Sequence, residues 1–215
     1  MKEYSSMPID MYVEELSSKN AVPGGGGTSA LAGALGTALT DMVGNLTVGK
    51  KKYAAVEDEI KKIMAETDKI KADLLSLIDK DPVVFEPLSK AYGLPSGTPE
   101  EAALKAEVLE KCLHEAASVP IAVMDCCAEG IELTARIAEI GSPLVVSDAG
   151  CAVLLLKAAM EGAALNVLVN TKFMKDREYA AQLNSDAARF IAEFGDKADA
   201  VYDKIYGRLL RSSVQ

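Results

Sequence analysis

Tryptophan is absent from this chain of 215 residues, and the only histidine is His114. The neighbours of His114 follow an ordinary helical pattern, so we give it no catalytic role. Without a second histidine, the sequence supplies neither a convincing Ser-His-Asp or Cys-His arrangement nor a multi-histidine metal site. Any acid–base chemistry must therefore use carboxylates or lysines.

The sequence also lacks a recognisable targeting segment or membrane span. Its first eight residues, MKEYSSMP, contain no apolar core of the kind found in signal peptides, and we expect a cytoplasmic protein. Residues 24–49 and 144–170 are low in charge. The first region is interrupted by glycines and an aspartate, and the second carries three charged side chains, so neither is a convincing span.

Cysteine is scarce, and its spacing does not match a zinc site. Each of the four cysteines lies among apolar residues in a helical pattern: Cys112, Cys126, Cys127 and Cys151. We therefore expect four buried structural thiols and no bound metal.

Basic residues are outnumbered 23 to 32 by acidic ones, which gives a formal charge of −9. This excess disfavours binding to nucleic acid and to anionic membranes. Positive charge gathers only at Lys50, Lys51 and Lys52. These lysines are either a solvated helix end, where cations suit the helix dipole, or a binding site for an extended anionic ligand.

The most informative motif present is the run PGGGGTS at residues 23–29. Gly24, Gly25, Gly26 and Gly27 remove every side chain from what we predict to be a bend, so that backbone N–H groups there can approach a ligand closely. An apolar Ala/Gly-rich helix follows, starting at about Thr28.

Helical periodicity dominates the rest of the chain, and no segment shows sustained strand alternation. We predict an all-α fold, a single-domain helical bundle of about eight to nine helices that spans residues 1–215, with its apolar Gly/Ala-rich helices at the centre. Pro82 should mark a new short helix, and Pro120 should kink or restart the helix that contains it. The expected helices cover residues 6–19, 28–47, 54–80, 81–92, 99–117, 120–140 and 149–170, with two more between 176 and 210.

Some polar residues interrupt the apolar helices 28–47 and 149–170 and need a reason to be there: Asp41, Asn45, Asp148, Asn166 and Asn170. Asn166 and Asn170 share one helix face. They form either an interhelix hydrogen-bonded pair or two amides that read the edge of a flat heterocycle. Asp81 and Asp148 each lie at a predicted helix start, where a carboxylate serves either as an acid–base group or as a cap.

Several motifs occur together and in order, and they carry a family resemblance: residues 23–29, 42–51, 77–81 with Phe85, 98–101, 119–120, 147–150 and 162–170. Over about residues 10 to 205, the chain resembles the formiminotetrahydrofolate cyclodeaminase family, which includes stand-alone methenyltetrahydrofolate cyclohydrolases. Each motif is weak alone, and the set is specific through its order and spacing.

The resemblance implies an all-helical subunit that forms a homodimer and binds a tetrahydrofolate derivative in a cleft, with no cofactor beyond this substrate. It implies one of two reactions. One is hydrolysis of 5,10-methenyltetrahydrofolate to 10-formyltetrahydrofolate, which the length of the chain mildly favours. The other is cyclodeamination of 5-formiminotetrahydrofolate to the methenyl form plus ammonia, with a separate formiminotransferase as a possible partner.

The resemblance also assigns roles to residues. Asp81 matches the catalytic aspartate of the family. Asp148 and Asn166 would orient the pterin or the reacting water, and Lys50 and Lys51 would contact the glutamate tail. Further binding positions are Gly24, Gly25, Gly26, Gly27, Thr28, Asn45 and Asn170. The chain departs from the family pattern at Pro82, where alanine is usual.

A different class of function remains open. The small-residue helices would also suit a non-catalytic helical assembly protein, in which Asp81 merely caps a helix. The polar groups on otherwise apolar helices disfavour that interpretation, because a purely structural bundle gains little by burying them.

Overall fold

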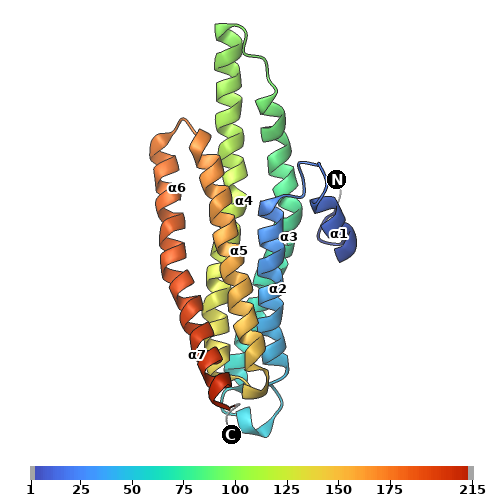
Figure 1. Ribbon diagram of the computed structural model, residues 1–215, viewed down its shortest axis with the longest axis vertical. Coiled ribbons are helices and arrows are strands. Elements are labelled where there is room, and N and C mark those ends of the chain that lie inside the picture. The colour runs from blue at the N-terminus through green and yellow to red at the C-terminus, as the bar shows by residue number, and fades with distance from the viewer. Residues whose placement is uncertain (1–2, 213–215) are drawn as a thin grey trace.

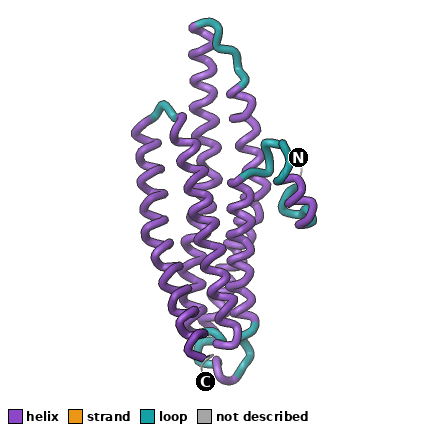
Figure 2. Tube along the Cα trace, viewed as in Figure 1, coloured by secondary structure: helices purple, strands orange, loops and turns teal. Residues whose placement is uncertain are grey.

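The computed structural model describes residues 3–212, which form an elongated bundle of long helices (Figure 1). Within these residues the chain is helical apart from its connecting loops, and it has no strand (Figure 2). The helices are α1 (Ile9–Leu16), α2 (Gly25–Asn45), α3 (Glu57–Tyr92), α4 (Pro99–Ile140), α5 (Val146–Phe173), α6 (Arg177–Phe190) and α7 (Asp196–Ser212). Two short 3₁₀ turns, Lys51–Tyr53 and Pro143–Val145, lie before α3 and α5.

The all-α prediction is confirmed, and the count of eight to nine helices is wrong. A π-helical turn, Ile191–Gly195, joins α6 to α7 without a break, so residues 3–212 hold six separate helical rods. Neither predicted interruption occurs, because α3 continues through Pro82 and α4 through Pro120. An internal proline removes one backbone hydrogen bond, and here the residues on both sides of each proline are buried in the core, Ile78 and Leu88 in α3 and Val119 and Val123 in α4.

The start of α4 matches the signal in its sequence, TPEE at residues 98–101, in which a capping threonine precedes a proline and a glutamate stands at the third helical position. The hydroxyl of Thr98 accepts a hydrogen bond from the Glu101 N–H at 3.2 Å, and the Glu101 carboxylate accepts one from the Thr98 N–H at 3.1 Å. Pro99 occupies the first helical position. This reciprocal capping box was readable from four consecutive residues because all its contacts are local.

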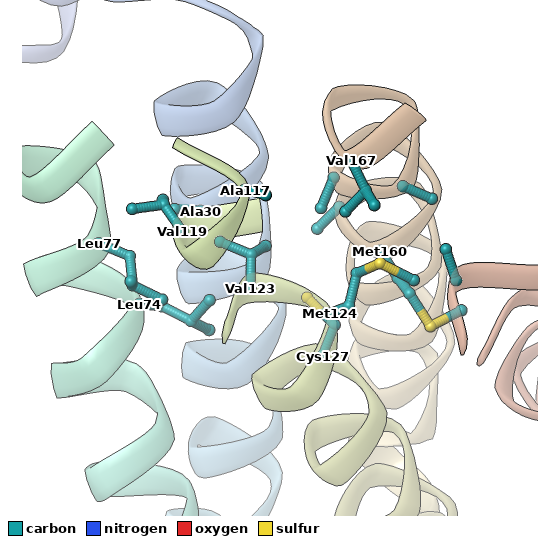
Figure 3. Close-up of a cluster of buried hydrophobic side chains, with 14 of the residues drawn as sticks. Ala30, Leu74, Leu77, Ala117, Val119, Val123, Met124, Cys127, Met160 and Val167 are labelled. Atoms are coloured by element: carbon teal, nitrogen blue, oxygen red, sulfur yellow. The ribbon is translucent and has the colours of Figure 1, made fainter. Parts of the chain in front are cut away.

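The core lies between α2, α3, α4 and α5, which pack on one another in a ring of four. Figure 3 shows its middle layer, where Ala30, Leu74, Val123 and Met160 come from the four helices in turn. Small residues let α2 approach α5 closely: a Cβ on Gly36 would lie 3.0 Å from the Ala152 carbonyl oxygen. The central position predicted for the Gly/Ala-rich helices is confirmed.

Two burial predictions are wrong. The apolar pattern of residues 6–19 predicts that Met11 and Val13 face the core, but on α1 they are 55% and 57% exposed, and Tyr12 is the buried residue instead. Cys151 is exposed and Cys126 is only half-buried, whereas Cys112 and Cys127 are buried as expected.

Helix α5 with its preceding turn, Pro143–Phe173, is the only described helix that is long and apolar enough to span a membrane by composition. In the bundle it packs against α2, α4, α6 and α7, and 44% of its apolar window is buried. Its apolar residues therefore divide between the core and an exposed outer face.

Candidate functional site

The glycine run forms the first turn of α2, not the predicted bend. Gly24 is the N-cap in an extended conformation, and Gly25, Gly26 and Gly27 are helical. The hydroxyl of Thr28 donates to the Gly24 carbonyl oxygen at 2.8 Å. The first N–H groups of a helix have no partners within it, so this turn presents free donors and the positive end of the helix dipole.

Asp81 reaches this turn from α3. Its Oδ2 accepts a hydrogen bond from the Gly27 N–H at 2.9 Å. A Cβ on Gly26 would lie only 2.2 Å from Asp81 Oδ1, so the carboxylate occupies space that any side chain at position 26 would fill. Asp81 is therefore no cap of its own helix, since α3 continues on both sides of it, and it caps α2 from across the interface.

The environment of Asp81 suits an acid–base group. Burial raises the pKa of the Asp81 carboxyl above its ordinary value, and the Gly27 N–H partly offsets this by stabilising the charged form. A carboxylate that is held in place and made more basic by desolvation can accept a proton from a bound water.

Asn166 approaches the same turn from α5. A Cβ on Gly25 would lie 3.3 Å from Asn166 Nδ2, and that amide donates to the Gly162 carbonyl oxygen at 2.9 Å. The hydrogen bond stays within α5, so the interhelix amide pair is not what the structure shows for Asn166. Asn170, half-buried one turn further along, lies on the same helix face.

Tyr12 is the neighbour that sequence reasoning missed. Its hydroxyl lies 3.4 Å from Thr28 Oγ1. Burial raises the pKa of the Tyr12 phenol, the contact with Thr28 lowers it, and the charge of Asp81 raises it further. The available signal was an aromatic residue with a polar tip in the short helix before the glycine run. Asp81, Asn166, Tyr12 and the first turn of α2 together define what we call the glycine end of the bundle.

The remaining predicted site residues lie at the opposite end, which we call the lysine end. Asn45 closes α2, Lys50 and Lys51 follow it, and Asp148 is in the first turn of α5. At 1.5 Å per residue, the 18 residues from Asp148 to Asn166 span about 27 Å. The prediction that these two side chains orient one pterin is therefore wrong for a single subunit.

Lys50 has a structural contact of its own at that end. Its ammonium group donates to the carbonyl oxygen of Leu46, the C-cap residue of α2. This contact supports the interpretation of the basic cluster as a helix end. No group of three or more His, Cys, Asp or Glu side chains within residues 3–212 is arranged to hold a metal.

A separate cavity of about 410 Å³ lies between α4 and α7. Its walls hold two ion pairs that join the helices, Glu132 with Lys197 and Glu139 with Lys204. Because these two lysines already pair with carboxylates, we interpret the cavity as part of the packing between α4 and α7. It is separate from the site at Asp81.

Fold and site define an all-helical bundle in which a buried carboxylate meets the glycine-rich start of a central helix. Residues 8–189 match the formiminotransferase-cyclodeaminase family. A methenyltetrahydrofolate cyclohydrolase from Methylorubrum extorquens is 38% identical over 201 residues, covering 94% of this chain and 97% of that protein. The chain belongs to the formiminotransferase-cyclodeaminase family.

Other relatives of this chain have a different architecture or a different name. A formimidoyltransferase-cyclodeaminase from Sus scrofa is 31% identical over 94% of this chain, which spans only 37% of that longer protein. The crystal structure of a formiminotetrahydrofolate cyclodeaminase from Thermotoga maritima matches with a TM-score of 0.80 at 27% identity, covering 99% of this chain and 100% of that one. This chain thus shares its fold with a protein named as a cyclodeaminase.

Proposed function

We propose that this protein is an enzyme that hydrolyses 5,10-methenyltetrahydrofolate to 10-formyltetrahydrofolate at the glycine end of the bundle. The observation that carries the proposal is the Asp81 carboxylate, desolvated and fixed by the Gly27 N–H. The 38% identity to a methenyltetrahydrofolate cyclohydrolase over nearly the whole of both chains favours hydrolysis over deamination.

The chemistry requires little more than one positioned base. The methenyl carbon bridges two nitrogens in a cationic amidinium group, which a carboxylate attracts. Water adds to this carbon, and Asp81 accepts a proton as the new C–O bond forms. The bond from carbon to N5 then breaks as N5 takes a proton and the new hydroxyl group loses its proton, which leaves the formyl group on N10. One water is consumed and one proton is released.

Asn166 supports the same site as a binding residue. Its amide lies beside Gly25, where it can hydrogen-bond a polar edge of the pterin, and Asn170 follows on the same face of α5. The N–H groups of Gly25 and Gly26 add donors at the positive end of α2. Asp148 and Asn45 are too far away to contact a pterin held there by one subunit.

A second candidate reaction is the cyclodeamination of 5-formiminotetrahydrofolate, favoured by the names of the Sus scrofa and Thermotoga maritima relatives. Here N10 attacks the formimino carbon and ammonia leaves, so one carboxylate again suffices to move the proton. The formimino substrate would then come from a separate formiminotransferase.

We also propose that the subunit forms a homodimer through the outer face of α2 and α5. Leu35 and Met42 on α2 are 49% and 45% exposed, and Leu154 and Leu165 on α5 are 44% and 64% exposed. Large exposed apolar side chains on two neighbouring helices are typical of an interface. Light scattering should give a dimer for the parent and a monomer for Leu154→Glu. A cytoplasmic location and the absence of a further cofactor stay predictions.

The experiment that tests the reaction follows methenyl absorbance and ammonia in parallel with purified protein. Loss of methenyl absorbance without ammonia release from the formimino compound identifies a cyclohydrolase. Release of ammonia with accumulation of the methenyl form identifies a cyclodeaminase. If neither activity is detected, the non-catalytic helical assembly protein becomes the favoured interpretation.

A further inference from the structure

Helices α3 and α5 both continue past the start of α2 (Figure 1), and each ends on an exposed aromatic side chain. Asp81 and Asn166 lie beside the first turn of α2. From there α3 runs on to its last residue, Tyr92, and α5 runs on to its last residue, Phe173. Tyr92 is 44% exposed and Phe173 is 54% exposed. Two large rings therefore stand at the glycine end, beyond the point that α2 reaches.

The two rings share helix faces with the polar residues of the candidate site. At 3.6 residues per turn, Tyr92 lies within about 20° of Asp81 around α3, and Phe173 lies within about 20° of Asn166 around α5. The rings contact each other, with centroids 6.4 Å apart and planes at 80°. The two helix faces are thus joined twice, by the first turn of α2 and by the aromatic pair.

Both helix ends that carry these rings are held by a cation. Lys105 on α4 donates to the Tyr92 carbonyl oxygen at 2.8 Å. Arg177 donates to the carbonyl oxygens of Thr171 and Met174 at 3.0 Å each. These contacts satisfy carbonyl groups that have no partner within a helix at its C-terminal end. The aromatic pair is therefore fixed in position, although its rings are exposed.

Lys172 adds a positive charge to the pair. Its Nζ lies 5.5 Å from the centroid of the Phe173 ring, within the range of a cation–π contact. No carboxylate in residues 3–212 pairs with this ammonium group, whereas the buried part of α5 pairs Lys157 with Asp199. On a chain with a formal charge of −9, an unpaired lysine beside two exposed rings suits a ligand that is both aromatic and anionic.

We propose that Tyr92, Phe173 and Lys172 form a subsite for an aromatic ring that bears a carboxylate. In the folate this group is the benzoyl ring on N10 with the first glutamate, an identity that rests on the proposed function. Seven residues of α5 separate Asn166 from Phe173, a distance of about 10 Å. A folate with its pterin near Asn166 can therefore place its ring against the aromatic pair and its carboxylate near Lys172.

The probe for this subsite is N-(4-aminobenzoyl)glutamate, which carries the ring and the carboxylates without the pterin. We expect it to inhibit the parent competitively against the methenyl substrate. It should also give a saturation-transfer NMR signal on its aromatic protons in the absence of any folate. N-acetylglutamate, which lacks the ring, should inhibit about tenfold more weakly, because it loses the aromatic contacts.

Phe173→Leu and Tyr92→Leu each remove one ring and keep an apolar side chain. Each should raise KM for the monoglutamate substrate and the inhibition constant of the probe about threefold to tenfold, with kcat within about twofold of the parent. Tyr206→Leu is the matched control, because Tyr206 is 52% exposed and its ring lies 5.7 Å from that of Tyr202 on α7. This control should keep the parental constants.

Lys172→Gln removes the charge and keeps a long polar side chain. It should raise KM for the monoglutamate about twofold to fivefold, as expected for one exposed ion pair, and the effect should shrink at high salt. Lys62→Gln, at an exposed lysine on α3, is the control and should leave KM unchanged. An equal change in both variants would mean that the effect comes from net charge and not from the subsite.

The outcomes separate this inference from the proposed function. Parental KM and inhibition constants in both ring variants would overturn the subsite while leaving the hydrolase intact. A parent inactive on both folates would overturn the proposed function, and the NMR signal of the probe would still decide the subsite. A signal that is absent from the parent, or equally strong in Phe173→Leu, would count against it.

Discussion

The two ends of the bundle carry the same kinds of polar residue in different settings. At the glycine end, Asp81 is desolvated and accepts a hydrogen bond from the Gly27 N–H, and Asn166 and Tyr12 approach the same turn of α2. At the lysine end, Asp148 lies in the first turn of α5 and Lys50 donates to the end of α2. The difference shows that a carboxylate at a predicted helix start is informative about function only when its surroundings in the neighbouring helices are known.

The two ends also show that the order of residues along the chain does not predict which of them lie together. Gly25 meets Asn166 while Gly36 meets Ala152, so α2 and α5 run antiparallel. The predicted binding residues of α2 and α5 therefore form two sets at opposite ends of the bundle. The first turn of α2 lies beside Asn166, whereas Asn45 and Asp148 lie at the other end. A single subunit can place only one of these sets around a given pterin.

The strongest test of the comparison makes the same change at both ends. Asp81→Asn should lower kcat by roughly a hundredfold or more, because the amide keeps an acceptor for the Gly27 N–H and loses the ability to accept a proton. Asp148→Asn should stay within about twofold of the parent if the transition state forms at the glycine end. Steady-state kinetics on the methenyl substrate decide between the ends, and equal losses in both variants would break the distinction.

Gly26→Ala sharpens the geometry of the glycine end. The added Cβ would overlap Asp81 Oδ1, so the carboxylate must rotate away from its place. We expect at least a tenfold loss in kcat/KM and none of the gain of about 0.5–1 kcal/mol that alanine normally brings to a helix. Thermal unfolding and kinetics on the same preparation check both parts. Full activity would mean that the position of Asp81 is unimportant.

The pH dependence should follow the raised pKa of Asp81. Turnover that needs the carboxylate falls by up to about tenfold per pH unit below that pKa. Between the unfolded and the folded pKa, the folded state binds the proton more tightly, so stability declines as pH rises through this window. Asp81→Asn removes this decline, and its thermal midpoint at neutral pH should equal or exceed that of the parent. A lower midpoint would mean that the charged carboxylate stabilises the fold.

The smallest effect is expected at the lysine end. From Gly27 to Asn45, α2 spans about 27 Å, so only a long glutamate tail reaches Lys50 and Lys51 from the glycine end. The double variant Lys50→Ala with Lys51→Ala should raise KM severalfold for a polyglutamylated substrate, and KM for the monoglutamate should stay unchanged. Equal effects on the two substrates would exclude a tail site at these lysines.

Local signals predicted much of the helical framework. The capping box at Thr98 and Glu101 and the close approach at Gly36 needed only nearby residues or residue size. The breaks expected at Pro82 and Pro120 failed, because packing on both sides of each proline keeps the helix continuous. The bend expected at the glycines failed because Asp81, 54 residues away from Gly27, completes the first turn of α2.

The site was predictable only in part for the same reason. Asp81 and Asn166 were singled out as polar residues in apolar or helix-start patterns, and their meeting at α2 depends on tertiary structure. Tyr12 was missed because the apolar pattern of α1 pointed to Met11 and Val13 as core residues, and both are exposed. The separation of Asp148 from Asn166 follows directly from helix rise, once helix 146–173 is known to be continuous.

The uneven burial of the cysteines has a practical consequence. All four lie in the described part of the chain, and Cys151 is the exposed one, on the outer side of α5. Burial raises the pKa of the Cys126 thiol to about 12 and that of Cys127 further, which suppresses the reactive thiolates. A maleimide dye should therefore attach selectively at Cys151. Because Cys151 lies one turn from Leu154 on the proposed dimer face of α5, it should react faster in a monomeric Leu154→Glu variant than in the parent.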